Sequence, residues 1–232
     1  MAANPADKSH VQTMFGRIAK RYDRMNRLMT LGQDQRWRRI VTHKAHLTNQ
    51  SIVLDIAAGT GDIAFEIRRQ YPKATVVAAD FALPMMQVGR DRPTGSQVEW
   101  LGANALQLPF PNNHFDAVVS GFLLRNVPDI DQTLAEHYRV LKPGGWAVSL
   151  DTTPPRDNLL RPFINLYLTS IVPLIGRLVV GDRDAYQYLS GSTLGFKKPE
   201  ALVTRFETVG FQDVGFRRLM LGTIAVHWAR KP

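Results

Sequence analysis

The stretch Ser51-Ile-Val-Leu-Asp-Ile-Ala-Ala-Gly-Thr-Gly-Asp62 decides how this chain folds. Residues 52–56 are almost all apolar, a composition typical of a buried parallel strand. The small residues 57–61 follow directly, and they predict a tight turn whose backbone a ligand can approach closely. A helical pattern occupies residues 62–70. Strand, glycine turn and helix in this order predict the first unit of a nucleotide-binding α/β fold.

Two carboxylates constrain the ligand of this turn. A second apolar strand, residues 75–80, ends in Asp80, about twenty residues beyond the glycines, the spacing expected of a group that binds a ribose diol. The turn also fits the dinucleotide pattern, so NAD is one alternative. Asp62 argues against NAD, because a helix N-terminus that holds a pyrophosphate should not carry a carboxylate beside it. S-adenosylmethionine has positive charge at its sulfonium and amino groups and is favoured; a turn without a ligand is the third interpretation.

Length and composition set wider limits. A chain of 232 residues predicts a single domain over residues 1–232. Cysteine is absent, which excludes disulfides, thiol nucleophiles and cysteine-ligated metals. The six histidines form no metal-binding pattern, so no metal is expected. The net charge is +9, and most of the excess falls in residues 1–46. This basic segment predicts contact with an anionic membrane or with nucleic acid; a solvated helical face is the alternative.

The segments before and after the glycine turn have separate predicted roles. Residues 1–46 are expected to form a helical lid over the carboxyl ends of the strands, where open α/β sheets bind ligands. Within this lid, Asp23 is expected to cap a second short helix, and a third helix is expected over residues 34–46. Residues 51–151 are predicted to form the donor-binding core. Its expected strands span 51–56, 75–80, 97–101, 115–120 and 145–151, and its expected helices span 62–70, 83–91 and 129–141.

Residues 154–192 depart from this alternation of strands and helices. Within them, residues 162–176 carry no charge, but they are too few to span a bilayer. They predict either a buried core helix or an apolar substrate-side wall that touches a membrane. Residues 198–232 predict a helix and two strands that pair as an antiparallel hairpin at the sheet edge. The expected fold is a doubly wound, mostly parallel seven-stranded α/β sheet with an antiparallel last strand and an N-terminal helical lid.

This order of elements resembles the class I S-adenosylmethionine-dependent methyltransferases, and several motifs narrow the resemblance to the quinone-biosynthesis C-methyltransferases. The motifs are Phe15-x-x-Ile18-Ala19-x-x-Tyr22-Asp23-x-Met25-Asn26 with Gly32 and Arg36-Trp37, Leu54-Asp55-x-Ala57-x-Gly59-Thr60-Gly61-Asp62, Asn104-Ala105-x-x-Leu108-Pro109-Phe110, Phe122-x-Leu124-Arg125-Asn126-Val127, and Ala185-Tyr186-x-Tyr188-Leu189 with Ser192. They spread over almost the whole chain. The sequence departs from the family at Gly121, where a serine is usual, so a hydroxyl near the methionine end of the donor is missing.

The resemblance implies methyl transfer from S-adenosylmethionine to a ring carbon of a reduced, polyprenyl-tailed quinone precursor. The donor is expected to contact the turn and the strand ends through Asp55, Gly59, Thr60, Gly61, Asp80, Phe81, Asn104, Ala105 and Gly121. Asp80 should accept hydrogen bonds from both ribose hydroxyls, as a carboxylate can; a helix cap is its alternative role.

For the acceptor, the expected catalytic residues are Arg125, which would stabilise a developing naphtholate, and His227, which titrates in the useful range. A surface ion pair with Asp129 or Asp131 is the alternative for Arg125, and a structural role is the alternative for His227. The substrate pocket is expected to include Tyr22, Asn26, Asn126 and Tyr188.

Demethylmenaquinol is the preferred acceptor, with the benzoquinol precursor of ubiquinone as the alternative. A nucleic-acid-binding protein or RNA methyltransferase that uses residues 1–46 is the alternative of another class. No nucleic acid is expected, because the sequence shows neither an RNA-binding appendage nor a base-methylation motif. A polyprenyl tail partitions into membranes, so we expect a cytoplasmic enzyme in peripheral contact with an anionic membrane surface. A monomer and a homodimer both remain open.

Overall fold

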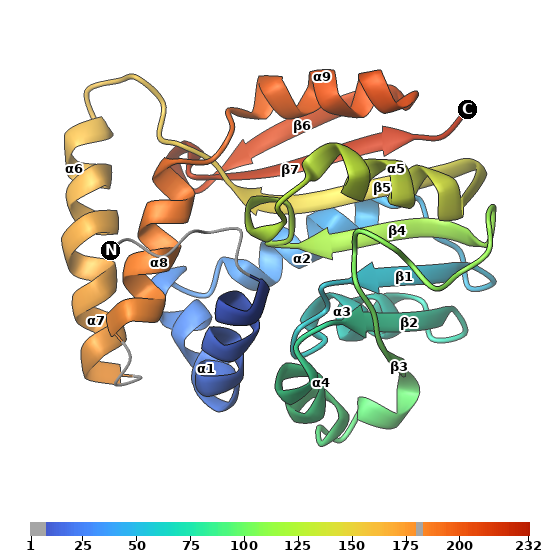
Figure 1. The fold of residues 1–232 in the computed structure, drawn as a ribbon, viewed down its shortest axis with the longest axis horizontal. Coiled ribbons are helices and arrows are strands. Elements are labelled where there is room, and N and C mark those ends of the chain that lie inside the picture. The colour runs from blue at the N-terminus through green and yellow to red at the C-terminus, as the bar shows by residue number, and fades with distance from the viewer. Residues whose placement is uncertain (1–7, 180–182) are drawn as a thin grey trace.

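The computed structural model describes residues 8–179 and 183–232. Its centre is a seven-stranded sheet with the strand order β3-β2-β1-β4-β5-β7-β6 (Figure 1). The strands are β1 (Ile52–Ile56), β2 (Thr75–Asp80), β3 (Glu99–Gly102), β4 (Phe115–Gly121), β5 (Leu141–Thr152), β6 (Gln212–Leu219) and β7 (Ile224–Arg230). The helices include α1 (Lys8–Met29), α2 (Asp34–Lys44), α3 (Asp62–Gln70), α4 (Leu83–Arg90), α5 (Ile130–Val140), α6 (Arg161–Leu166), α7 (Val172–Val179), α8 (Arg183–Leu194) and α9 (Pro199–Val209).

Helices cover both faces of the sheet because its central strands are apolar on both faces. Successive residues of a strand point to opposite faces, and both Val53 and Leu54 of β1 are fully buried. Trp37 of α2 belongs to the same buried cluster as Val53, whereas Phe206 of α9 belongs to the cluster of Leu54. β1 itself pairs in parallel with β2 and β4. The sheet is therefore doubly wound around parallel central strands.

The C-terminal strands close the sheet in the antiparallel sense. β7 pairs with β5, where Val148 lies opposite Trp228, and also with β6, which forms the edge. β5 begins earlier than expected, because Leu141 pairs with Phe115 across an irregular register. The predicted mostly parallel seven-stranded sheet with an antiparallel last strand is confirmed, and so is the terminal hairpin.

Two expectations for the N-terminal segment are wrong. Asp23 begins no second helix, since it lies inside the continuous helix α1. Its Oδ1 accepts a hydrogen bond from the Thr60 hydroxyl (2.7 Å), and its carboxylate pairs with Arg92. Asp23 therefore ties α1 to the glycine turn. α2 is not part of a lid, because the buried side chain of Trp37 packs onto one face of the sheet.

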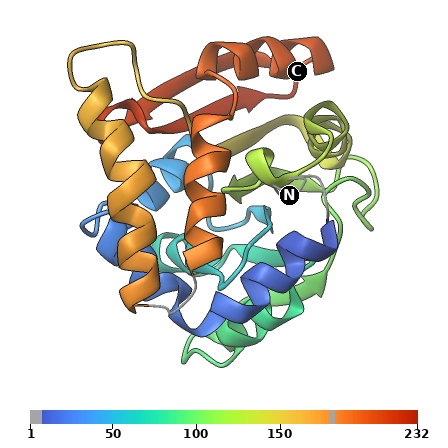
Figure 2. The ribbon, with the colours of Figure 1, turned by 60° about the vertical axis from the view of Figure 1, so that its left-hand side comes forward.

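Four helices stand together at the carboxyl ends of the parallel strands. α1, α6, α7 and α8 occupy this side of the molecule in both views (Figure 1, Figure 2). α6 continues through a π-helical turn, Tyr167–Ile171, into α7. Met14 and Ile18 of α1 pack with Val172 of α7. The segment 154–192 therefore lies beside α1, next to the strand ends where ligands bind in such folds.

Candidate active site

The glycine turn after β1 requires residues with little or no side chain. Ala57, Gly59 and Gly61 all have positive φ, at 58°, 58° and 83°, a region that most side chains disfavour. A Cβ on Gly61 would also lie 2.5 Å from the Trp100 ring. The local sequence therefore allows a turn that a longer side chain would prevent, and it brings the start of α3 close to the end of β1.

Asp80 ends β2 and holds this turn in place. Its Oδ2 accepts a hydrogen bond from the Gly59 amide (2.7 Å), and its Oδ1 accepts one from the Ala82 amide (2.7 Å) at the start of α4. Burial raises the pKa of this carboxyl, while hydrogen bonds from backbone amides act to lower it. A carboxylate oxygen can accept more than one hydrogen bond. Asp80 therefore combines the capping role with acceptors for a diol.

Asp55, near the end of β1, is buried and incompletely hydrogen-bonded. Its Oδ2 accepts a bond from the Ala64 amide (3.0 Å), whereas its Oδ1 has no partner in residues 8–179 and 183–232. Burial raises the pKa of this carboxyl to about 8, and the carboxylates of Asp80 and Asp62 act in the same direction. A cation beside Asp55 would stabilise its charged form. The protonated amino group of a methionine moiety fits this requirement.

These groups line a first cavity, which we call the donor cavity. The predicted donor residues that line it are Asp55, Gly59, Thr60, Asp80, Phe81, Asn104, Ala105 and Gly121. Gly61 is the exception, since it forms the N-cap of α3 and lies under the Trp100 ring. Gly61 therefore has a structural role, and its expected contact with the donor stays a prediction. The Thr60 hydroxyl is already bonded to Asp23, so a donor would meet the backbone of Thr60.

Sequence reasoning missed Arg38, a buried side chain of α2 that lines the donor cavity. Arg38 pairs with Asp34 one helical turn earlier and with Asp62 (Nη2···Oδ2 2.7 Å). Arg92 pairs with Asp62 as well (Nη1···Oδ1 2.6 Å). Two cations therefore balance the charge of Asp62, which makes it a weaker argument against a phosphate ligand than the sequence indicated. The only indication of this in the sequence was the i, i+4 spacing of Asp34 and Arg38, which predicts an ion pair on one face of a helix.

A second cavity, which we call the helical cavity, lies among α1, α6, α7, α8 and the strand ends. Its volume is about 700 Å³, and most of its wall is apolar. Four residues line both cavities: Phe15, Tyr22, Asn26 and Phe122. We call these four residues the shared wall. A ligand in one cavity would meet a ligand in the other there.

Arg125 lines the helical cavity and forms a buried ion pair. Its Nη1 donates to Oδ1 of Asp151 near the end of β5 (2.7 Å), and both side chains are at most 3% exposed. The Arg125 guanidinium carbon lies 4.9 Å from the centre of the Phe122 ring, and its Nε has no acceptor among the described residues. The alternative of a surface ion pair is wrong, because Asp129 caps α5 and Asp131 pairs with another arginine.

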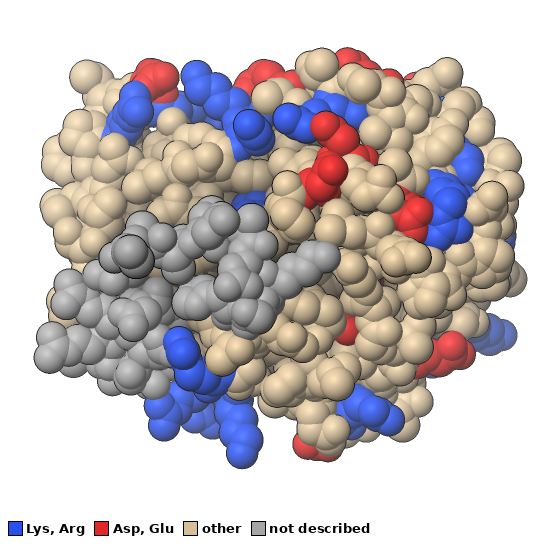
Figure 3. Space-filling view, viewed as in Figure 1, with Lys and Arg blue, Asp and Glu red and all other residues tan. Residues whose placement is uncertain are grey.

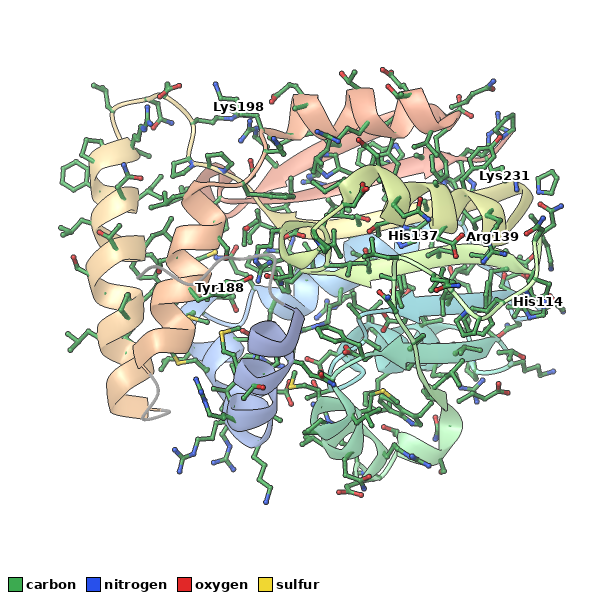
Figure 4. All side chains as sticks on the ribbon, viewed as in Figure 1. His114, His137, Arg139, Tyr188, Lys198 and Lys231 are labelled. Carbon is green, nitrogen blue, oxygen red and sulfur yellow. The ribbon has the colours of Figure 1, made fainter. Side chains whose placement is uncertain are left out.

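The other predicted substrate residues gather near Arg125. They are Tyr22, Asn26, Asn126 and Tyr188. The Tyr188 hydroxyl donates to Asn126 Oδ1 (2.9 Å), and Asn126 Nδ2 donates to the Phe122 carbonyl (2.8 Å). Burial raises the pKa of the Tyr22 phenol, while Asn26 and the charge of Arg125 act to lower it. Figure 4 shows Tyr188 on α8, on the side of the molecule where α1 lies. The structure therefore brings the sequence-predicted polar residues together.

His227 is the predicted residue that the structure places elsewhere, which corrects its expected catalytic role. It is buried on β7, with Nε2 3.2 Å from the Pro199 carbonyl and its ring stacked on Phe206 and Phe216. Burial lowers the pKa of this imidazole to about 4. Among the described residues that line the two cavities, none is a histidine. His227 is therefore a neutral core residue between the sheet and α9.

The sheet order, the glycine turn and the joined cavities define the class: this is the fold of class I methyltransferases. The structure superposes on phosphoethanolamine N-methyltransferase 2 of Haemonchus contortus, solved in complex with S-adenosyl-L-methionine, with a TM-score of 0.65. The match covers 85% of this chain and 52% of that one at 16% identity. At this identity the likeness concerns the fold alone.

A family model described as the ubiE/COQ5 methyltransferase family matches residues 3–231, and the chain belongs to this family. The ubiquinone/menaquinone biosynthesis C-methyltransferase UbiE of Desulfotalea psychrophila is 50% identical over 95% of this chain and 90% of the relative. The demethylmenaquinone methyltransferase of Lactiplantibacillus plantarum is 42% identical over 96% of each chain. The predicted family and enzyme class, a methyltransferase, are confirmed.

Proposed function

We propose that this protein transfers the methyl group of S-adenosylmethionine to a ring carbon of demethylmenaquinol, a reduced quinone precursor with a polyprenyl tail. The names of the two relatives support this activity. The observation that carries the proposal is the shared wall, which joins a donor cavity containing buried acids to a large apolar cavity. Methyl transfer needs such a junction, because the donor methyl group and the acceptor carbon must meet in near contact.

The donor cavity offers a partner for each part of S-adenosylmethionine, which supplies an electrophilic methyl group on its sulfonium. Asp80 would accept the two ribose hydroxyls while it holds the Gly59 amide. The free Oδ1 of Asp55 would receive the donor's amino group. Phe81 would pack on the adenine ring. Gly121, at the end of β4, would leave space beside the sulfonium.

Arg125 would stabilise the negative charge that develops on the acceptor. A quinol hydroxyl gives up its proton, and the ring carbon bonds to the methyl group as the carbon–sulfur bond breaks. The ring then releases its hydrogen as a proton while the hydroxyl is restored. Arg125 cannot act as the base, but Asp151 fixes its guanidinium in a buried setting where an aligned cation strongly stabilises an oxyanion. Asn26, whose side chain lies beside the Tyr22 hydroxyl, is a second polar group at the shared wall.

The helical cavity would hold the start of the polyprenyl tail, and the tail links the enzyme to a membrane. Such a quinol resides in the bilayer, so the proposal includes a cytoplasmic protein in peripheral contact with the membrane surface. In the described part of the chain, no helix has the length and hydrophobicity to cross a bilayer. Exposed basic side chains on α1, among them Lys20 and Arg24, would attract anionic lipids.

Methyl transfer from labelled S-adenosylmethionine to quinols of both ring types tests the proposal. We expect transfer to reduced demethylmenaquinol and none to its oxidised form, because the quinone lacks the electron-rich carbon. Transfer to the benzoquinol alone would overturn the naphthoquinol assignment. Donor binding without transfer to either ring would overturn the substrate class, and transfer to RNA would favour the other class of function. Tight binding of NADH would contradict the donor assignment.

A further inference from the structure

The helical segment formed by α6, the π-helical turn and α7 is apolar on two opposite faces. Ile164 and Val172 are buried against the protein. The outer face, counted together with the turn that leads into α6, exposes large apolar side chains: Leu159 and Leu160 in the turn, and Phe163, Leu166, Ile171 and Leu174 on the helices. Their exposure reaches 93% at Leu159 and 70% at Phe163. A helix that is apolar all round is normally covered on every side, yet the described residues leave this outer face uncovered.

Further apolar side chains extend this surface. Leu28 and Leu31 are exposed at the end of α1, and Leu221 is exposed between β6 and β7. We call these three residues together with the outer face of α6 and α7 the apolar rim. The rim residues that also line the helical cavity are Leu28, Leu31, Leu160, Phe163 and Leu221. Because the same side chains meet both solvent and the cavity, the rim surrounds the cavity mouth. An exposed apolar patch of this kind marks an interaction site.

Charged side chains lie beside the apolar rim. Residues 162–176 contain no charged residue, and Figure 3 shows a mainly uncharged surface at the left-hand edge, where α6 lies in Figure 1. Lys and Arg side chains gather below α1 in the same view, and Lys20 and Arg24 are among the exposed residues of α1. An apolar surface bordered by cations is complementary to an anionic bilayer, where apolar groups enter the acyl boundary and cations meet the headgroups.

We infer that the apolar rim inserts into the surface of an anionic phospholipid bilayer, so that the helical cavity opens directly into the acyl region. This inference rests on the proposed function, since a polyprenyl tail must pass between the bilayer and the cavity. A second copy of the chain seated on the rim would close the cavity mouth. The bilayer keeps the mouth continuous with an apolar phase, and it is therefore the occupant that suits an enzyme for a tailed quinol.

Site-directed labelling tests the contact directly, because the chain has no cysteine. Leu166→Cys places a polarity-sensitive fluorophore on the rim. Leu83→Cys on α4 is the matched control, since the exposure of the two leucines is 56% and 59%. With vesicles of phosphatidylcholine and phosphatidylglycerol, we expect a blue shift at position 166 and none at position 83. Equal shifts at both positions, or no shift at position 166, would overturn the inference.

A triple substitution measures the contribution of the rim to vesicle binding. Leu159→Ser, Leu166→Ser and Leu174→Ser remove apolar side chains that do not line either cavity. We expect the affinity for the anionic vesicles, measured by co-sedimentation, to weaken by about tenfold or more. Each removed leucine side chain no longer contributes the favourable free energy of moving apolar surface out of water. Donor affinity by calorimetry and Tm should stay unchanged. Leu83→Ser combined with Leu101→Ser removes exposed leucines from another surface and should leave vesicle binding unchanged.

The two hypotheses fail in different ways. If the triple variant binds vesicles as well as the unchanged protein while quinol methylation continues, the rim inference fails and the proposed function stands. If no quinol is methylated but the rim variants still lose vesicle binding, the proposed function fails and the membrane contact stands. A dimer in solution that the triple substitution dissociates would assign the rim to a second copy and overturn the bilayer assignment.

Discussion

The donor cavity and the helical cavity share a wall, but they are built in different ways. The donor cavity is formed by a turn and strand ends, and backbone amides fix its central acid: Asp80 accepts hydrogen bonds from the Gly59 and Ala82 amides. The helical cavity is formed by side chains of α1, α6, α7 and α8. The comparison teaches that a short contiguous motif can specify the first cavity, whereas the second depends on how distant helices pack.

Substitutions in the two cavities should therefore have separable effects. A group that contacts the donor in its ground state changes affinity, whereas a group needed for charge in the transition state changes turnover. The shared wall is where this separation would break down, because its residues line both cavities.

Arg125→Met should have the largest effect. Loss of the guanidinium should lower turnover by about 10²- to 10³-fold with donor affinity nearly unchanged, as for the loss of an aligned oxyanion-stabilising group. The substitution also leaves Asp151 buried and unpaired, which costs about 3–5 kcal/mol of unfolding free energy. Single-turnover kinetics, donor calorimetry and chemical denaturation measure these three quantities.

The double variant Arg125→Met/Asp151→Asn separates the two effects. An amide at position 151 removes the unpaired charge and keeps one oxygen that can accept from the Thr152 or the Arg125 backbone amide, which bind different oxygens of Asp151, so stability should recover in part. Turnover should remain low. If turnover recovers together with stability, Arg125 has only a structural role, and the assigned stabilisation of the acceptor is wrong.

Asp80→Ala should weaken donor binding by about 1–3 kcal/mol, the range for losing hydrogen bonds to a charged group. Turnover at saturating donor should change far less than in the Arg125 variant. Since Asp80 also holds the Gly59 amide, Asp80→Asn is the control that keeps an acceptor for the turn. Unchanged donor affinity in Asp80→Ala, measured by calorimetry, would remove Asp80 from the donor site.

Asp55→Asn should abolish a proton release that accompanies donor binding. The pKa of Asp55 is raised to about 8 by burial, so this carboxyl is mostly protonated at pH 7. If the donor's protonated amino group binds the ionised form, about one proton should leave for each donor bound at pH 7, and the number released should fall as pH rises, because Asp55 is then already ionised. Calorimetry in two buffers of different ionisation enthalpy measures the proton count. Equal counts in the variant and the unchanged protein would exclude this role of Asp55.

His227→Gln should have the smallest effect on function, with turnover unchanged, because His227 lies outside both cavities. Its pKa is lowered to about 4, below the unfolded value of about 6.5. Between these values the unfolded state binds more protons, so the free energy of unfolding falls as pH decreases through this window. The variant should lose part of this acid sensitivity, and His137, whose pKa burial also lowers to about 4, should retain its own part. A large drop in kcat would restore a catalytic role.

The donor side could be predicted from the sequence because its chemistry follows directly from local order. If the strands 52–56 and 75–80 pair in parallel, their carboxyl ends lie side by side, and Asp80 must lie next to the glycine turn. The structure shows this pairing, with Ile56 opposite Ala79. The ion pairs could not be predicted in the same way. Arg125 and Asp151 are 26 residues apart in the chain and meet only because β5 ends beside the loop after β4. Nothing local indicates that contact.

Two segments show why the sequence could not tell which way an apolar or buried element faces. β7 has an almost uninterrupted run of buried residues, so alternation could not indicate which face His227 occupies. Residues 162–176 carry no charge, and a core helix and a membrane-facing helix share that composition. In both segments the sequence indicates that the side chains avoid water, but it does not indicate which neighbouring surface they face.

The tie between Asp23 and Thr60 has a further consequence for the order of events. α1 carries Tyr22 and Asn26 of the shared wall, and Asp23 in the same helix holds the glycine turn. A displacement of this helix therefore alters both compartments at once. If the methyl donor changes the affinity for the quinol by some factor, then the quinol must change the affinity for the donor by the same factor. Capture of a quinol would then change the affinity for the methyl donor, and loss of the methyl group from that donor would change the affinity for the methylated product.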